Sequence, residues 1–494
     1  MDLSDSIKAI SLREPGKLYI GGNWIEPASE EPFDLISPIT EEHFYSAAQA
    51  GAEDVGKAVS AARAAFDEGP WPRMEPWERA VYLRRMGEIL AGRGEELGHM
   101  WTAQIGLILS MAQYAGYAAK MSFDDFADLA ETFDWETPYD FGDGAGPQLL
   151  VREPVGVVAN IVPWNAALPL AVMKSAPALL AGCTVILKPA PETPLEAIAL
   201  AEAAEEAGLP PGVFNVLPAD REVAEMLVRN PGIDKVSFTG SSVAGMKIAQ
   251  IMASRMGRYT MELGGKSPAI VLEDADPDTV AQQLSGAICR TSGQTCASLT
   301  RVIVPAAKHD LFADAFAKAM SGLKLGDPYA AETHLGPLAM KRQFDRVAGF
   351  IEQAKAEGAD LVTGGGRGAG LDKGYFFQPT LFANVDNRMK IAREEIFGPV
   401  LSLIPARDVD EAVRIANDTP YGLNAAVFTS DSKRAYEIAR RIRAGSVSQG
   451  QNRISFKVAF GGFKQSGVGR EGSSAEGLLP FTETKTIYLD KLPG

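Results

Sequence analysis

Residues 155–162 read Val-Gly-Val-Val-Ala-Asn-Ile-Val, and an apolar stretch that runs to Leu180 follows them. The eight residues predict a buried strand, and the longer stretch predicts a helix. The same order then recurs, with strand-like residues at 184–187, 213–217 and 235–238 and helical segments at 195–207, 221–229 and 242–254. Alternation of this length is typical of an open parallel sheet, where ligands lie at the carboxyl ends of the strands.

A second alternating block runs from residue 266 to about residue 430. It contains strand-like residues at 269–272, 301–304 and 400–403 and helical segments at 309–322 and 341–356. The glycine-rich run 364–370 stands between two strand-like stretches and has no helix after it, so we expect a surface loop there and not a nucleotide-binding loop. The chain therefore predicts an α/β protein with two mainly parallel sheets.

The flanking segments are less regular. Short strand signals at 18–20 and 33–36 precede a helical region at 53–132. Apolar residues at 149–151 and 485–489 predict two further strands. We expect the strand at 485–489 to pair with the 149–151 region of another subunit, because an unpaired strand edge invites a second chain.

Composition narrows the class of protein. The chain has 494 residues, too many for one core, and its 48 Lys and Arg against 63 Asp and Glu give a net charge of −15. That charge opposes nucleic acid and anionic membranes as partners. The apolar stretch 166–187 contains Lys174 and breaks at Gly182, which favours a core helix and strand over a membrane span. Residues 1–11 have no apolar core of a secretory signal.

The cysteines and histidines exclude other classes. Three cysteines without framework spacing make a disulfide scaffold improbable, and a needed free thiol favours a reducing, cytoplasmic location. Four scattered histidines offer no zinc spacing, so we expect no metal site. They also make a Ser-His-Asp triad unattractive.

The third cysteine stands in a stretch suited to chemistry. Residues 291–300 read Thr-Ser-Gly-Gln-Thr-Cys-Ala-Ser-Leu-Thr, which places Cys296 among small and hydroxyl side chains that allow close approach to its sulfur. A thiolate that attacks a carbonyl needs a base and a stabiliser of the oxyanion. Glu262 and Asn165, each in a short motif of its own, are the candidates for these two tasks.

Six motifs resemble the aldehyde dehydrogenase superfamily in order and spacing, and the resemblance covers roughly residues 18 to 490. They are Pro-Trp-Asn at 163–165, Phe-Thr-Gly-Ser at 238–241, Glu-Leu-Gly-Gly-Lys-Ser at 262–267, Gly-Gln-Thr-Cys at 293–296, Glu-Glu-Ile-Phe-Gly-Pro at 394–399 and Gly-Gly-Phe-Lys-Gln-Ser-Gly-Val-Gly-Arg-Glu at 461–471. No single motif would suffice. Together they imply the hydrolytic, NAD(P)-dependent branch of that superfamily.

The resemblance implies a role for each matched residue. Cys296 would form a thiohemiacetal and then a thioester, Glu262 would activate water, and Asn165 would donate to the oxyanion. The cofactor, NAD or NADP, would be held by residues on the strand ends and turns: Lys188 and Glu395 at the two riboses, Gly240 and Ser241 at the pyrophosphate, and Phe397 at the nicotinamide ribose, with Trp164, Gly245 and Leu263 beside them.

The resemblance also implies the domains and the assembly. Residues 1–134 and 155–264 would form a Rossmann-like dinucleotide-binding domain, and residues 265–466 a second Rossmann-like domain that carries Cys296. Residues 135–154 and 480–494 would form a small β-flap for assembly into a homodimer or homotetramer.

The chain departs from the family at the adenosine end and beside the active site. Pro191 stands where most members have the ribose-binding Glu, and the carboxylate has moved to Glu192. We therefore expect NAD to be used and NADP to be tolerated. The strand at 445–452 is unusually polar.

The substrate tunnel is the third departure. Acetaldehyde-preferring relatives narrow it with aromatic rings, whereas the matching positions here are Ala166, Met173 and Ile454, and Phe460 alone keeps a ring. Further apolar candidates for its lining are Ile108, Leu109, Met111 and Tyr114. This favours a bulky apolar aldehyde, aromatic or terpenoid.

Three rivals remain. A semialdehyde enzyme would use Arg290 as a carboxylate anchor. An acyl-CoA-forming relative usually lacks the Glu262 base, and a catalytically silent structural protein tends to lose the Cys or the Glu.

Overall fold

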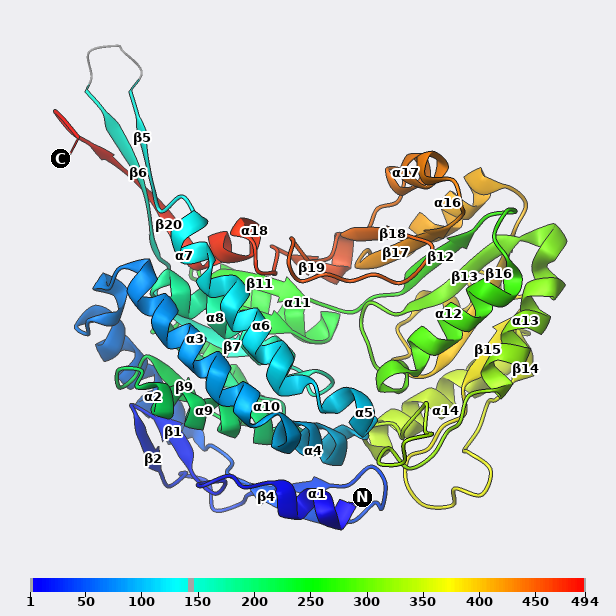
Figure 1. Cartoon of the computed structure of the whole chain (residues 1–494), viewed down its shortest axis with the longest axis horizontal. Coiled ribbons are helices and arrows are strands. Elements are labelled where there is room, and N and C mark those ends of the chain that lie inside the picture. The colour runs from blue at the N-terminus through cyan, green and yellow to red at the C-terminus, as the bar shows by residue number, and fades with distance from the viewer. Residues whose placement is uncertain (1–2, 141–145, 493–494) are drawn as a thin grey trace.

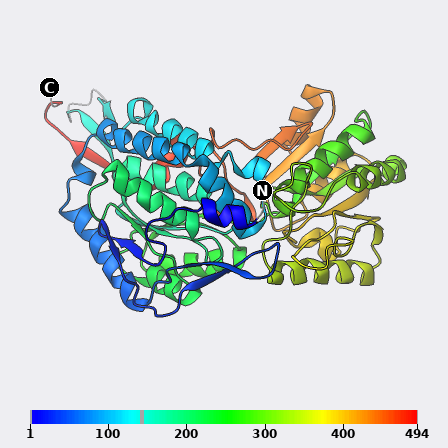
Figure 2. The ribbon, with the colours of Figure 1, turned by 60° about the horizontal axis from the view of Figure 1, so that its bottom comes forward.

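The structure is a computed structural model that describes residues 3–140 and 146–492. It forms two lobes with a narrow flap projecting from the first, as Figure 1 shows. Parts of the predicted first domain (1–2) and of the predicted flap (141–145 and 493–494) lie outside the described residues. The N-terminal helix α1 (Leu3–Ala9) lies beside the junction of the lobes, and the C-terminus lies at the flap (Figure 2).

The first lobe is built on an eight-stranded sheet whose five central strands are parallel, β11-β10-β7-β8-β9. Its edges are antiparallel additions. In sheet order the strands are β19 (Gly467–Val468), β11 (Arg258–Glu262), β10 (Lys235–Thr239), β7 (Val157–Ile161), β8 (Thr184–Lys188), β9 (Phe214–Val216), β1 (Leu18–Ile20) and β2 (Asn23–Ile25).

Helices cover both faces of this sheet. Alternate residues of β7 point to opposite faces: Val158 packs in one core and Val157 and Ala159 in the other. The first face is covered by α8 (Ala167–Ala181) and α9 (Leu195–Ala207), behind which lie α3 (Pro76–Gly92), α4 (Gly94–Ile105), α6 (Ala115–Ala127) and the shorter α5 (Leu109–Ala112) and α7 (Leu129–Thr132). The second face is covered by α2 (Ala52–Asp67), α10 (Arg221–Arg229) and α11 (Ser242–Ala253).

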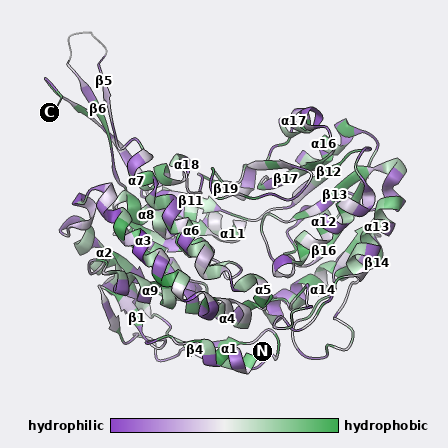
Figure 3. Cartoon of the chain, in the orientation of Figure 1, coloured by the Kyte–Doolittle hydropathy of each residue, from purple (hydrophilic) through white to green (hydrophobic). Residues whose placement is uncertain are grey.

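The second lobe has a seven-stranded sheet that is parallel except for its first strand. In sheet order the strands are β14 (Asp360–Thr363), β15 (Thr380–Ala383), β16 (Val400–Ala406), β13 (Leu299–Pro305), β12 (Ser267–Val271), β17 (Asn424–Phe428) and β18 (Ser446–Gln449). One face is covered by α12 (Pro277–Cys289) and α13 (His309–Ser321), and the other by α14 (Lys341–Ala356), α15 (Lys390–Arg393), α16 (Val409–Asn417) and α17 (Ser432–Ala439). The covering helices carry both hydrophobic and hydrophilic residues (Figure 3).

Both sheets confirm the predicted α/β class of two doubly wound, mainly parallel sheets with a small β-flap. The glycine-rich run 364–370 is a loop between β14 and β15, as predicted, and no helix follows it before β15. A two-stranded ribbon of β3 (Phe33–Ile36) and β4 (His43–Ala47) completes the first lobe. In the described part of the chain, no helix is long and apolar enough to cross a membrane.

The flap corrects one expectation. β20 (Thr482–Tyr488) pairs antiparallel with β6 (Gln148–Pro154) of the same chain, and β5 (Glu136–Tyr139) covers the other edge of β6. The predicted pairing of these strands between subunits is therefore wrong. The cause is local: the Val155 N–H donates to the Phe481 carbonyl at 3.0 Å, which brings the start of β20 beside the end of β6. The strand β5 had no prediction of its own.

Candidate active site

A cavity of about 440 Å³ lies between the two lobes, at the carboxyl ends of the strands of the first sheet. It is lined by most of the predicted site residues, namely Trp164, Asn165, Gly240, Ser241, Leu263, Cys296, Glu395 and Phe397. Three predicted residues, Lys188, Gly245 and Glu262, are not part of its wall. Gln343, Arg346 and Tyr421 also line it, although no sequence motif had pointed to them.

The loop before Cys296 has a strained backbone. Thr291, Ser292 and Gly293 have φ values of 54°, 54° and 74°, a left-handed region that non-glycine residues rarely adopt. The Ser292 hydroxyl donates to the Gly336 carbonyl at 2.8 Å, which holds the loop. A Cβ at position 293 would lie 2.2 Å from the Gly398 carbonyl oxygen, so only glycine fits there. The loop thus fixes Cys296 between η2 (Arg290–Gly293) and β13.

The Cys296 thiol is half-buried in a small apolar group formed with Ala297, Leu423, Phe456 and Phe460. Burial, together with the charges of Glu395 and Glu262 and against the Ala297 N–H, raises its pKa to about 12. The thiol is therefore protonated at neutral pH in this arrangement. The other two cysteines, Cys183 and Cys289, are buried.

Asn165 and Cys296 are joined through one neighbour. The Asn165 Nδ2 donates to the backbone carbonyl of Gln294 at 2.9 Å. The fully buried Gln294 side chain accepts from the Ala339 N–H at 3.0 Å and donates to the Thr291 carbonyl at 2.9 Å. The Asn165 amide is thus bound to Gln294, which stands two positions before Cys296 in the chain. Gln294 is a site residue that the sequence analysis missed.

Glu262 lies at the end of β11, where it is buried and is not part of the cavity wall. A Cβ at Gly461 would lie 2.6 Å from Glu262 Oε1, and neither carboxyl oxygen makes a well-formed hydrogen bond within the described residues. Burial raises its pKa well above 4.5, the charge of Glu471 adds to this, and Lys174 and Arg470 oppose it. The charge of Glu262 in turn acts on the Cys296 thiol and raises its pKa, so the two groups lie near each other.

A buried ion pair stands beside Glu262. Lys174 of α8 pairs with Glu471, and its Nζ lies 3.3 Å from the Ser237 hydroxyl. Both side chains are almost inaccessible to solvent. A lysine inside an apolar helix was the signal for this pair, which the sequence analysis had used only to exclude a membrane span.

The helix α11 begins at the cavity wall. Ser241 caps it, and its hydroxyl accepts from the Ala244 N–H at 3.3 Å. The first N–H groups of a helix have no partner within the helix and carry partial positive charge, so they suit an anion. Gly245 packs against Leu263, which lines the cavity: a Cβ at position 245 would lie 2.5 Å from Leu263 Cδ2.

Two aromatic rings meet at the cavity. Trp164 and Phe397 are edge-to-face with centroids 5.3 Å apart. Phe397 has a left-handed φ of 63°, and Gln343 Nε2 holds its carbonyl at 2.7 Å. Next to it, Glu395 Oε1 accepts from the Gly265 N–H at 3.0 Å, and burial raises the pKa of Glu395 to about 7.

Lys188 ends β8 and is buried outside the cavity wall. Burial lowers its pKa to about 8, against the charges of Glu192 and Asp220. Glu192 itself pairs with Arg342 of α14 at 2.6 Å. The Glu192 carboxylate is therefore held by a cation of the second lobe.

Polar residues of β17, β18 and the segment after β18 form a hydrogen-bond network. Asn424 Nδ2 donates to the Ala297 carbonyl and to the Asn452 side chain, both at 2.9 Å, and Ser446 donates to Asn424 Oδ1 at 3.0 Å. β18 is an edge strand of the second sheet, and its Ser446 hydroxyl finds its hydrogen-bond partner in Asn424. The network ends one residue from Cys296.

The predicted tunnel residues lie as follows. Met173 and Phe460 are buried, whereas Ile454, Met111 and Tyr114 are exposed. Phe456, which had not been considered, packs against Phe460 with the ring centroids 4.9 Å apart and the ring planes tilted by 59°. Phe456 therefore adds a second ring beside Cys296, at a position outside the matched tunnel set. Arg290 is exposed.

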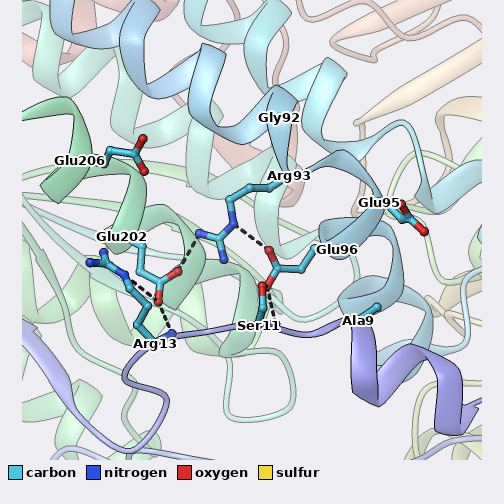
Figure 4. Close-up of a pocket in the computed structure, with 9 residues that line it drawn as sticks. All are labelled: Ala9, Ser11, Arg13, Gly92, Arg93, Glu95, Glu96, Glu202 and Glu206. Atoms are coloured by element: carbon cyan, nitrogen blue, oxygen red, sulfur yellow. Dashed lines mark hydrogen bonds and ion pairs between the residues drawn. The ribbon is translucent and has the colours of Figure 1, made fainter.

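A second, open pocket of about 650 Å³ lies elsewhere, where the N-terminal segment crosses α4 and α9. Figure 4 shows its charged lining: Arg93 bridges Glu96 at 2.8 Å and Glu202 at 2.7 Å, and Arg13 reaches Glu202. These ion pairs tie the N-terminal segment to the first lobe. Cys296 is not part of this pocket.

Comparison with known proteins agrees with this geometry. The model of the aldehyde dehydrogenase family matches residues 24–487. The chain is 43% identical to geranial dehydrogenase of Castellaniella defragrans over 96% of this chain and 98% of that protein. It is 41% identical to a Mycobacterium tuberculosis aldehyde dehydrogenase complexed with NAD+, with a TM-score of 0.94 over 97% of this chain and 99% of the other.

A third relative is a mutant aldehyde dehydrogenase C from Pseudomonas syringae in complex with NAD+ and octanal. It is 40% identical, with a TM-score of 0.93 over 97% of this chain and 98% of that one. The chain belongs to the aldehyde dehydrogenase family.

Proposed function

We propose that the protein oxidises an aldehyde to the carboxylic acid, with Cys296 as nucleophile and NAD or NADP as hydride acceptor. One observation carries this proposal: Cys296, Asn165, the N-terminus of α11 and the Trp164–Phe397 pair share one cavity. The thiol suits attack on an aldehyde carbonyl, and the helix N-terminus suits binding of a pyrophosphate.

The first half of the reaction acylates the enzyme. The Cys296 thiol gives its proton to water, and its sulfur bonds to the carbonyl carbon as the carbonyl π bond breaks. The oxygen that gains the negative charge is met by the Asn165 amide and the Cys296 N–H. One N–H of the Asn165 amide is bound to the Gln294 carbonyl, and its second N–H remains available for this oxygen. The nicotinamide supplies the acceptor for the hydride that leaves this carbon, and the C=O bond re-forms as a thioester on Cys296.

The second half releases the acid. Glu262 takes a proton from water, the hydroxide adds to the thioester carbonyl, and the Cys296 sulfur leaves as thiolate. Burial raises the pKa of Glu262, which makes its carboxylate a stronger base for this proton.

The residues around the cavity fit a dinucleotide. The cavity wall includes Ser241 at the start of α11, and the rings of Trp164 and Phe397 offer apolar contact to the nicotinamide end. Lys188 and Glu395 are proposed to hold the two riboses. NAD+ in the solved relatives supports NAD as cofactor, and Pro191 supports tolerance of NADP because it removes a carboxylate that would repel the 2′-phosphate.

We assign the domains accordingly. Residues 1–134 and 155–264 bind the dinucleotide, residues 265–466 carry Cys296, and residues 135–154 and 480–494 form the assembly flap. The division follows the two sheets, because the chain passes from the first sheet to the second between β11 and β12. A reducing compartment such as the cytoplasm would preserve the Cys296 thiol.

The substrate is proposed to be a bulky apolar aldehyde, aromatic or terpenoid. The side chains that pack on Cys296 are apolar, and Met173 adapts to irregular ligands. The relatives named for geranial and complexed with octanal support an apolar substrate. Phe456 adds a second ring, which favours flat, unsaturated substrates.

The test is a comparison of kcat/KM for geranial or benzaldehyde, acetaldehyde and succinate semialdehyde. We expect geranial or benzaldehyde to lead. If succinate semialdehyde leads by tenfold, or about 1.4 kcal/mol of transition-state binding, Arg290 is a carboxylate anchor and the apolar proposal is wrong. The exposure of Arg290 argues against that result. NADH formation with any of these aldehydes excludes a silent structural protein, and a free acid product excludes the acyl-CoA branch.

A further inference from the structure

An ion pair bridges the two lobes close to the adenosine end of the proposed cofactor site. Glu192 lies in the turn between β8 and α9 of the first lobe, and Arg342 lies in the first turn of α14 in the second. Their charged groups are 2.6 Å apart. Glu192 is 22% exposed and Arg342 is 66% exposed, so the pair is reachable from solvent.

The same helix also forms part of the cavity. Gln343 and Arg346 of α14 line it, directly after Arg342 in the chain. On the other side of the pair, the charge of Glu192 acts on Lys188, which ends β8. One carboxylate therefore stands between two cations, Lys188 and Arg342, one from each lobe.

We propose that Arg342 is a specificity-determining residue that binds the 2′-phosphate of NADP, and that Glu192 competes with this phosphate for it. The inference rests on the proposed function, because it places the adenosine ribose at Lys188. A guanidinium recognises phosphate oxygens in the same forked geometry as it recognises a carboxylate. An exposed pair of this kind is weak enough to exchange partners.

The proposal gives opposite directions for the two partners. Removal of Arg342 takes away a cation and leaves Glu192 to repel the 2′-phosphate, so NADP is disfavoured. Removal of the Glu192 charge frees Arg342 and removes repulsion, so NADP is favoured. NAD has a hydroxyl at this place and is affected little by either change.

The experiment measures binding of 2′,5′-ADP and 5′-AMP to the full chain by titration calorimetry, which needs no turnover. We expect Arg342→Ala to weaken 2′,5′-ADP about tenfold, or about 1.4 kcal/mol, and to change 5′-AMP less than twofold. Glu192→Gln should strengthen 2′,5′-ADP several-fold. Arg342→Lys should retain part of the binding. The kcat/KM ratio of NADP to NAD should move in the same directions.

Lys341→Ala is the matched control. It removes the same charge from the adjacent residue, whose partner is Asp345 at 2.6 Å, and it should leave both ligands unchanged. The inference is overturned if Arg342→Ala changes 2′,5′-ADP and 5′-AMP equally, or if it changes neither. If the unaltered protein binds neither ligand, the adenosine site of the proposed function fails instead.

Discussion

At the scale of single residues, the site combines a protonated thiol with a buried carboxyl group. Burial keeps Cys296 in the thiol form, and burial and the charge of Glu471 raise the pKa of Glu262. An attacking cysteine is usually activated by a lowered pKa. Here a change in the surroundings of Cys296 during the reaction must lower the pKa of its thiol. The resting enzyme should therefore react slowly with thiol reagents.

This gives a prediction for pH dependence. With a pKa of about 12, the thiolate fraction of Cys296 rises about tenfold per pH unit. Alkylation of the cofactor-free enzyme by iodoacetamide should therefore accelerate about tenfold for each pH unit between pH 7 and pH 10. Mass spectrometry of the modified peptide measures the rate, and Cys296→Ala is the control. A plateau below pH 8 would show that the thiol is already activated.

At the scale of elements, α11 must approach β11 closely for its N-terminus to reach the cavity. Gly245 makes this approach possible, since any side chain there meets Leu263. We predict that Gly245→Val forces Leu263 into the cavity, weakens NAD+ binding and destabilises the fold by about 1–3 kcal/mol.

Thermal unfolding and NAD+ titration measure the two effects. Gly286→Ala on α12 is the control, because nothing lies within 4 Å of its added methyl group. That change should be neutral or stabilising by up to about 1 kcal/mol. Equal behaviour of the two variants would refute the packing argument.

Much of the fold follows from local pattern. The segments predicted at 195–207 and 221–229 are α9 and α10 with the same bounds, because hydrophobic periodicity and clear end signals mark them. The pairing of β20 with β6 was mispredicted, since a strand pattern does not name its partner chain. Gln294 and Gln343 are visible only when distant segments meet, because their hydrogen bonds reach Ala339 and Phe397.

At the scale of the whole molecule, the flap extends beyond the first lobe (Figure 1). Within the described residues, β5 and β20 are the two outer strands of this three-stranded sheet. Small isolated sheets of this kind are marginal alone and gain stability by contact with another surface. The flap is therefore the element that we expect to contact a second copy.

We predict a homodimer or homotetramer at micromolar concentration. Sedimentation velocity measures this directly, and removal of residues 482–494 should reduce the size of the assembly. A monomer of the intact chain would contradict the prediction.

The division of labour between Cys296 and Glu262 is the central claim, and rapid mixing of the Glu262→Gln variant with NAD+ and a reactive aldehyde tests it most directly. Glutamine keeps the size of the side chain but cannot take a proton. We predict a burst of about one NADH per active site, followed by turnover at least about a hundredfold slower than in the unaltered enzyme, and no NADH from Cys296→Ala. Steady turnover of Glu262→Gln at the unaltered rate, or NADH formation by Cys296→Ala, would contradict the account.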